Sequence, residues 1–296
     1  MPRAPRTRTS KEASTPAVSP KAEVPANVLA DVPAKPRRSR AKSAKNEVVR
    51  GPAEAPSPGR EAPGARTAAA SEPEESPERR HALRARLPKA KRFVAMAGNI
   101  GAGKTTAAKM LSQSFGFELF DEPVIDNRFL KDYYADMRRW SFTLQLEFLI
   151  RRVEHHELIH KVKKSCVQDR TLYEDPEIFA KYLHGLGNMT NAELDLYFEY
   201  FQRLSHSIAK PDKVICFDVG NVAVLLDRIR VRGREEEKGI QKDFLRGLNG
   251  YYAGFPQVLT GKYGIECLTL DVSTLDIRTG AGREEFLDRV TTFLAA

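Results

Sequence analysis

The fold is decided by residues 93–106, which read FVAMAGNIGAGKTT. Residues 93–97 form a short apolar run typical of a strand, and residues 105–115 have the pattern of a helix leading out. Between them, residues 98–105 match the motif G-x-x-x-x-G-K-[ST]. Its glycines let backbone N–H groups turn inward around phosphate oxygens, and the N-terminus of the helix adds a favourable partial charge. We therefore expect the chain to bind a nucleoside triphosphate.

The loop also predicts individual contacts. Lys104 is expected to reach the β- and γ-phosphates, and the Thr105 hydroxyl is expected to hold Mg²⁺. The residues expected to contact the triphosphate are Gly98, Asn99, Ile100, Gly101, Ala102, Gly103, Lys104, Thr105 and Thr106. Switch GTPases, motor ATPases and small-molecule kinases share this loop, so the reaction has to be read from the rest of the chain.

Beyond residue 90, short apolar runs rich in β-formers alternate with segments of helical periodicity. The runs are residues 92–97, 117–121, 165–169, 213–219 and 265–272, and the helical segments include 105–115, 140–163, 192–208, 221–232 and 284–294. Continuous hydrophobicity is typical of parallel strands covered on both faces. The alternation predicts a doubly wound α/β fold of the P-loop NTPase type, with a five-stranded parallel sheet flanked by helices.

The composition divides the 296-residue chain near residue 90. All 25 aromatic residues lie beyond that point, whereas 14 of the 18 prolines and the whole net charge of +9 lie before it. We interpret residues 1–88 as a disordered low-complexity tail and residues 91–296 as one folded domain. The basic cluster at 35–40 suits weak contact with nucleic acid or another acidic partner, but a solubilising extension is the favoured interpretation. The electrically balanced domain excludes a DNA-coating basic fold.

Other features exclude a membrane or secreted protein. No apolar run approaches the roughly 18 residues of a spanning helix. The N-terminus lacks the apolar core of a secretory signal. Three cysteines, Cys166, Cys216 and Cys267, are too few for a disulfide framework and sit in apolar runs. These features favour a cytoplasmic protein with no membrane contact.

Charged residues follow two of the predicted strands. In open α/β sheets, ligands bind outside the carboxyl ends of the strands. Glu122, which follows the second run, is a candidate general base for an attacking hydroxyl. After the third run, Asp169 is suited to holding Mg²⁺ or its water, and Arg170 to neutralising charge on the transferred group. Each residue alone is weak evidence for a catalytic site. Their joint placement at successive strand ends strengthens that interpretation.

Two helical segments carry further candidates. Gln145 and Arg152 are seven residues apart and share a face, from which an amide and a guanidinium suit the edge of a planar base. An amphipathic surface would show the same pattern. Arginines at 228, 230, 232 and 234 suit a mobile lid that closes on ATP, although the pattern alone favours a solvated charged face.

Taken together, these residues resemble the deoxynucleoside kinase family, and the bacterial deoxyadenosine and deoxyguanosine kinases in particular. The resemblance covers about residues 91–296 and is carried by GNIGAGKTT, DEPV, RRWSFTLQ, QDRTLYEDPEIFA and DRIRVRGREEEKGI. It implies transfer of the γ-phosphate of ATP, with Mg²⁺, to the 5′-hydroxyl of a deoxynucleoside, purines being favoured, in nucleotide salvage. It also implies a homodimer packed through helices.

The resemblance also implies residue roles. Glu122 matches the general base, and Arg170 matches the arginine beside the 5′-hydroxyl. Positions that contact the nucleobase correspond to Gln145, Arg152 and Asp175; positions at the 3′-hydroxyl correspond to Tyr134 and Glu237; and lid arginines correspond to Arg228, Arg232 and Arg234. By the same resemblance, Tyr134 crowds out a 2′-hydroxyl.

This sequence departs from the family pattern in two places. Residues 169–171 read Asp-Arg-Thr where the family often has Glu-Arg-Ser. Asp276 and Ile277 stand where an Asp-Phe pair often packs against the donor base.

Two other functions fit parts of the sequence. A kinase for a nucleoside monophosphate or another small acceptor would share the loop but would need extra basic groups in the acceptor pocket. An NTP-dependent switch or nucleic-acid-binding module would use the basic tail as its contact. The set Gln145, Arg152 and Asp175 suits a neutral nucleoside better.

Overall fold

The computed structural model describes residues 75–121, 128–234 and 237–296. In chain order its elements are α1 (Pro77–Ala85), β1 (Phe93–Gly98), α2 (Lys104–Phe115), β2 (Glu118–Phe120), α3 (Leu130–Ala135), α4 (Met137–Lys161), β3 (Cys166–Gln168), the π-helical segment η2 (Asp175–Ala180), α5 (Lys181–Gly185), α6 (Asn191–Ser205), β4 (Lys213–Asp218), α7 (Val222–Arg232), α8 (Lys242–Tyr263), β5 (Glu266–Asp271) and α9 (Gly280–Ala295). All five predicted strands are present, within one or two residues of their expected ends.

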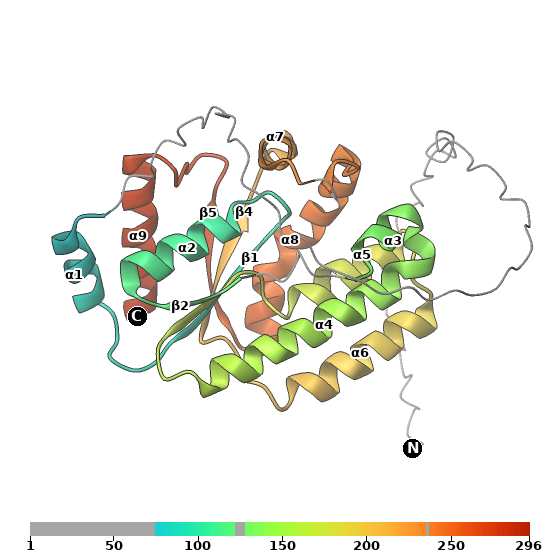
Figure 1. The fold of residues 1–296 in the computed structure, drawn as a ribbon, viewed down its shortest axis with the longest axis horizontal. Helices are drawn as coiled ribbons and strands as arrows, with labels where there is room; N and C mark the ends of the chain where they lie inside the picture. The colour runs from blue at the N-terminus through green and yellow to red at the C-terminus, as the bar shows by residue number, and fades with distance from the viewer. Residues whose placement is uncertain (1–74, 122–127, 235–236) are drawn as a thin grey trace, which may run out of the picture. The chain divides into compact units, whose positions relative to one another are not determined.

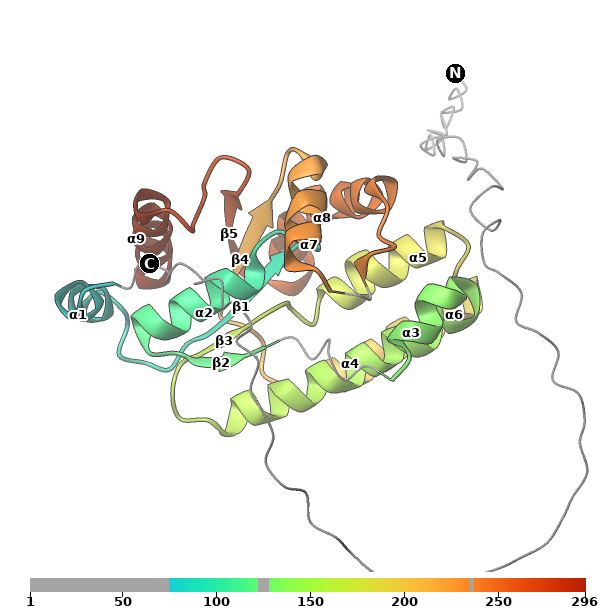
Figure 2. The same cartoon turned by 45° about the horizontal axis from the view of Figure 1, so that its top comes forward.

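The sheet confirms the predicted doubly wound fold. Its strand order is β2-β3-β1-β4-β5, and every neighbouring pair is parallel. In the central strand β1 all six residues are buried, because side chains leave both faces of the sheet into apolar layers. Val94 and Met96 enter one core, shared with α2, α7 and α9, whereas Phe93 and Ala95 enter the other, shared with α4, α6 and α8. Helices therefore cover both faces (Figures 1 and 2).

The parallel topology places functional segments at one edge. β1 ends at Gly98, where the glycine-rich loop begins, and β3 ends immediately before Asp169. The backbone N–H of Asp169 donates to the carbonyl of Phe120 at the end of β2 (2.9 Å). The residues that follow β1, β2 and β3 therefore share the carboxyl edge of the sheet, where open α/β folds bind their ligands.

Helix α1 corrects the predicted extent of the tail, since residues 75–88 are ordered rather than disordered. Ser76 caps the helix, with its hydroxyl accepting from the N–H of Arg79 at 3.2 Å, and Pro77 occupies the first turn. Leu83 is only 3% exposed. The Arg84 guanidinium donates to the carbonyls of Ser114 (2.9 Å) and Gln113 (3.1 Å) at the end of α2. Composition hid these few specific contacts within a polar, alanine-rich stretch.

Ion pairs fix the same segment to the C-terminal helix α9, which lies next to α1 in both views (Figures 1 and 2). The buried carboxylate of Glu75 lies 3.0 Å from Nε of Arg283, and its other oxygen lies 2.8 Å from Nε of Arg79. The described part of the folded domain therefore begins at residue 75 rather than 91. The predictions for residues 1–74 lie outside the described residues.

Replacing Leu83 by alanine tests this packing. The substitution removes buried side-chain volume where α1 meets α2 and α9, so we expect the free energy of unfolding to fall by about 2–3 kcal/mol. Urea unfolding measures the change. His81→Ala, at an exposed position of the same helix, should alter stability by less than about 0.5 kcal/mol. Equal stability of the Leu83 variant and wild type would show that α1 is not docked in solution.

None of the helices in the described part of the chain combines the length and hydropathy needed to cross a bilayer.

Candidate active site

The phosphate-binding loop connects β1 to α2 in a conformation that its glycines make possible. Gly101 has φ +81°, and a Cβ there would lie 2.7 Å from the carbonyl oxygen of Leu225. Gly103 has φ +97° and caps α2 without a side-chain hydrogen bond. The Lys104 side chain is 6% exposed and its Nζ donates to the carbonyls of Gly98 (2.7 Å) and Asn99 (3.0 Å). The loop therefore holds an ammonium group at the N-terminus of a helix, where anions bind.

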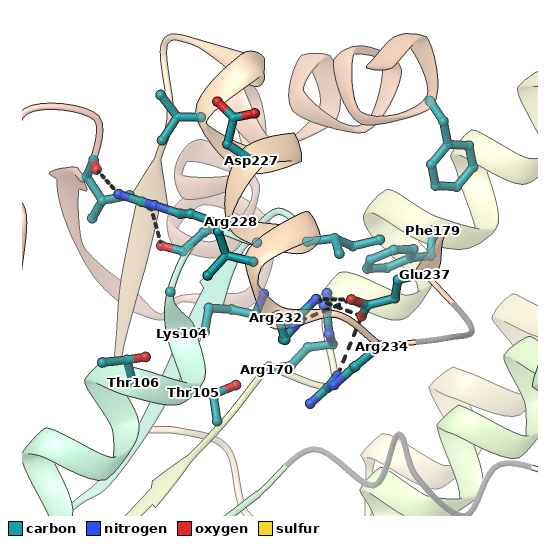
Figure 3. A pocket seen from close by; sticks show the side chains of 18 of the residues that line it. Lys104, Thr105, Thr106, Arg170, Phe179, Asp227, Arg228, Arg232, Arg234 and Glu237 are labelled. Carbon is teal, nitrogen blue, oxygen red and sulfur yellow. Dashed lines mark hydrogen bonds and ion pairs between the residues drawn. The ribbon is translucent and has the colours of Figure 1, made fainter. Parts of the chain in front are cut away.

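A cavity of about 820 Å³ opens from this loop (Figure 3). Of the residues predicted from sequence, those that line it are Ile100, Gly101, Ala102, Gly103, Lys104, Thr105, Thr106, Tyr134, Gln145, Arg152, Arg170, Asp175, Arg228, Arg232, Arg234, Glu237 and Asp276. They come from segments far apart in the chain. The candidate triphosphate-binding and acceptor-binding residues thus share one cavity.

Three predicted residues lie behind the cavity wall instead of lining it. Gly98 ends β1, and the Asn99 side chain joins the loop to α8 by donating to the carbonyl of Leu245 (3.0 Å). Asp169 accepts a hydrogen bond from the Thr105 hydroxyl at 2.5 Å. Glu122 lies outside the described residues.

The wall of the cavity carries a buried ion pair. Nε and Nη2 of Arg152 donate to the two carboxylate oxygens of Asp175, at 2.5 and 2.8 Å. Burial raises the pKa of the Asp175 carboxyl, and Arg152 opposes that effect. Beside the pair, the side-chain oxygen of Gln145 is buried and has no hydrogen-bond partner among the described residues. A buried acceptor of this kind needs a donor, which a bound ligand or a water molecule can supply.

The cavity is also lined by aromatic residues that sequence reasoning missed. Phe148 packs under Arg152, whose Cζ lies 5.3 Å from the ring centroid, and Phe179 packs under Arg170 at 4.8 Å. Tyr133 and Phe244 also line the cavity. Phe148 lies between Gln145 and Arg152 on α4, so the helical periodicity could have indicated it. No pattern near Phe179 foretells the π-helical turn that places it.

Arg170 has an unusual backbone. Its φ is +72°, and it is the one non-glycine residue with positive φ in the described parts of the chain. Its Nη1 donates to Glu174 (3.3 Å) and to the Tyr252 hydroxyl (3.1 Å). Strained backbone at a cavity is typical of functional positions, where surrounding contacts hold it in place.

The predicted lid arginines lie on and after α7 and line the same cavity. Arg228 donates to the carbonyls of Ala102 (3.4 Å) and Val272 (3.0 Å). Figure 3 shows Arg232 and Arg234 meeting the carboxylate of Glu237; the shortest distances are 2.6 and 3.5 Å, respectively. They form an ion-paired cluster facing the cavity rather than a solvated face. Asp276, which also lines the cavity, pairs with Arg278 at 2.9 Å, and Ile277 lines the cavity beside it in the chain.

A family comparison agrees with this geometry. A sequence model described as deoxynucleoside kinase matches residues 94–295, which is more than half of the chain. The chain belongs to the deoxynucleoside kinase family. It is therefore a kinase of deoxynucleosides.

The chain is similar to individual members of this family. It is 37% identical over 164 residues to deoxyadenosine kinase of Dictyostelium discoideum, covering 55% of this chain and 66% of the relative. It is 33% identical over 187 residues to deoxyguanosine kinase of Bacillus subtilis, covering 62% and 88%. A solved structure of M. mycoides deoxyadenosine kinase with bound dATP has a TM-score of 0.59 and 26% identity; the match covers 69% of this chain and all of that one.

Helix α1 lies outside the region that the deoxynucleoside kinase model matches, which starts at residue 94. The cavity, in contrast, is built wholly from residues inside that region. The family match therefore includes every described residue lining the cavity, whereas α1 lies outside it.

Proposed function

We propose that this kinase transfers the γ-phosphate of ATP to the 5′-hydroxyl of a purine deoxynucleoside. The observation that carries the proposal is the shared cavity, which is lined both by Lys104 and the glycine-rich loop and by Gln145, Arg152 and Asp175. Phosphoryl transfer needs donor and acceptor held in line, and positioning supplies most of the catalysis. The relatives named deoxyadenosine kinase and deoxyguanosine kinase support the purine preference.

The acceptor end favours a neutral base over a second phosphate. The charge of Arg152 is compensated by the bidentate contact with Asp175, so this guanidinium is poorly suited to binding a phosphate. The amide of Gln145 can accept from an amino group and donate to a ring nitrogen, which is how amides recognise adenine. Phe148 and Phe179 provide flat apolar surface for a ring.

At the sugar, we assign Tyr134 and Glu237 to the 3′-hydroxyl, with Tyr134 also excluding a 2′-hydroxyl. Both line the cavity. Arg170 would stabilise charge on the transferred phosphoryl group beside the 5′-hydroxyl, and Glu122 would accept the proton of that hydroxyl. The arginines at 228, 232 and 234 would contact the donor, with Asp276 beside them.

The residues at the loop fit Mg²⁺. The Thr105 hydroxyl directs its proton to Asp169, which leaves the lone pairs of the oxygen available to a cation. The described residues contain no cluster of three or more His, Cys, Asp or Glu side chains that could hold a metal alone. This suits Mg²⁺, which uses few protein ligands and completes its shell with phosphate and water. The bound cation would neutralise charge on the phosphates; we assign Thr105 to its shell and Asp169 to holding Thr105 or a metal-bound water.

We further propose a homodimer in the cytoplasm. Helices α4 and α6 pack together and expose Ile150, Leu158, Leu196 and Tyr200, each at least 41% accessible. Burying such an apolar surface against a second copy would remove it from water. The three cysteines carry free thiols, as suits a reducing compartment. Light scattering after size exclusion would measure the oligomeric state.

The direct test is phosphorylation of deoxyadenosine, deoxyguanosine, deoxycytidine and thymidine by purified protein with Mg-ATP. A no-acceptor control and a deoxynucleoside monophosphate series complete it. We expect monophosphate product from one or both purine nucleosides and little from the pyrimidines. A monophosphate as the preferred acceptor, or ATP consumed at the same rate without acceptor, would overturn the proposal. Product from pyrimidines alone would overturn only the base preference.

A further inference from the structure

Glu174 is a fully buried carboxylate directly behind the cavity. It is 0% exposed and does not line the cavity, so it is not placed to touch either substrate. One oxygen accepts from the N–H of Gly98 (3.2 Å), from the Tyr252 hydroxyl (2.7 Å) and from Arg170 (3.3 Å). The other accepts from the N–H of Thr171 (2.7 Å). All four partners are donors, a set that a carboxylate accepts in full and a neutral amide cannot.

These partners join three separate parts of the site. Gly98 is the first residue of the phosphate-binding loop, Thr171 belongs to the turn after β3, and Tyr252 lies on α8. Burial raises the pKa of Tyr252 well above its ordinary value, so its hydroxyl remains a proton donor. Glu174 therefore fixes the distance between the loop that holds the donor and the turn that carries Arg170.

The contacts converge on Arg170. Its backbone has φ +72°, and the next peptide N–H, that of Thr171, is held by Glu174. Its guanidinium is held at Nη1 by Glu174 and Tyr252, and its Cζ lies over the ring of Phe179. A conformation rarely adopted by residues other than glycine persists only when its surroundings determine it, and Glu174 supplies both the backbone and the side-chain contact.

We propose that Glu174 is a positioning residue for catalysis, which holds Arg170 in its strained conformation and in register with the phosphate-binding loop. The proposal rests on the proposed function, in which Arg170 stabilises the transferred phosphoryl group. It assigns to Glu174 an effect on turnover rather than on binding, because misplacing a group that acts in the transition state lowers kcat more than it raises KM.

The test compares Glu174→Gln with Glu177→Gln, a matched change three residues away. Glu177 is also buried (4% exposed) and accepts from Lys181, Lys262 and Tyr263 at 2.5–2.6 Å, but neither it nor these partners line the cavity. We expect Glu174→Gln to lower kcat by about 10- to 30-fold, with the KM of each substrate within about threefold of wild type. Glu177→Gln should keep kcat within about twofold of wild type, even where both variants lose stability.

A double-mutant cycle with Arg170→Met separates positioning from general support. If Glu174 acts through Arg170, adding Glu174→Gln to Arg170→Met should lower kcat by less than about threefold further. A loss of kcat in the double variant equal to the product of the two single losses would overturn the proposal. A normal kcat for Glu174→Gln, or an equal loss in both glutamate variants, would also overturn it.

Crystal structures of wild type and Glu174→Gln decide the matter independently of turnover. We expect the Arg170 guanidinium to move by about 1 Å or more, a displacement large enough to matter in catalysis. An unmoved Arg170 would overturn the proposal. If wild type phosphorylates no deoxynucleoside, the proposed function fails, and this structural comparison still tests what Glu174 holds.

Discussion

Replacing Lys104 by methionine should lower kcat/KM for deoxynucleoside phosphorylation by about a thousandfold. Methionine preserves an unbranched, buried side chain of similar length but removes the ammonium group that Lys104 places beside the loop carbonyls. In phosphoryl transfer, preorganised positive charge in a site that excludes water is the largest contribution to rate, and each lost donor typically costs a factor of a hundred or more. The measurement is initial rate against Mg-ATP and nucleoside concentration.

Lys109 provides the matched control. It lies on the same helix α2 and lines the same cavity, but its side chain is exposed. Lys109→Met should change kcat/KM by less than about fivefold, because an exposed charge is screened by solvent. Circular dichroism would confirm that both variants are folded. A Lys104 variant that retains a tenth of wild-type activity would remove this residue from the catalytic group.

Replacing Glu122 by glutamine should lower turnover by roughly a hundredfold or more while ATP still binds. The chain leaves β2 at the carboxyl edge of the sheet, next to the end of β3. A carboxylate that follows there can take the proton of a 5′-hydroxyl, and an amide of the same shape cannot, so the change removes general base catalysis alone. Turnover under saturating substrates, together with titration of ATP by calorimetry, separates the two effects.

Asp121→Asn controls for the loss of one negative charge at the same strand end. The Asp121 side chain is exposed, and we expect its replacement to change turnover by less than about threefold. Equal losses in the two variants would point to the summed negative charge of this strand end rather than to a specific base. Near-normal turnover of the Glu122 variant would exclude Glu122 from the base role.

Most of the fold could be predicted from the sequence because the patterns that indicate its strands and loop are local. The central strand is a short run that is apolar on both faces, residues 93–97, and the glycine-rich loop marks the turn from β1 to α2. Parallel topology then brings the ends of β1, β2 and β3 to one edge, so residues as distant as Thr105 and Asp169 could be expected near each other.

Other parts of the site depend on contacts that no local pattern encodes. The pairing of Arg152 with Asp175 and the position of Phe179 follow from a π-helical segment, whose hydrogen-bond register has no sequence signature. Helix α1 was missed because one leucine and a few ion pairs outweigh a composition that resembles a linker. The ion pairs that join Glu237 to Arg232 and Arg234 likewise have no signature in the sequence pattern.

The docking of α1 has a consequence for how the kinase can be divided. The family match starts at residue 94, yet the carbonyl groups at the end of α2 are satisfied by Arg84, and Arg283 of α9 is paired with Glu75. A recombinant chain trimmed to the family boundary would keep every described cavity residue but leave an arginine of the core without its carboxylate. The region that the family model matches is thus smaller than the smallest unit that should fold with full stability.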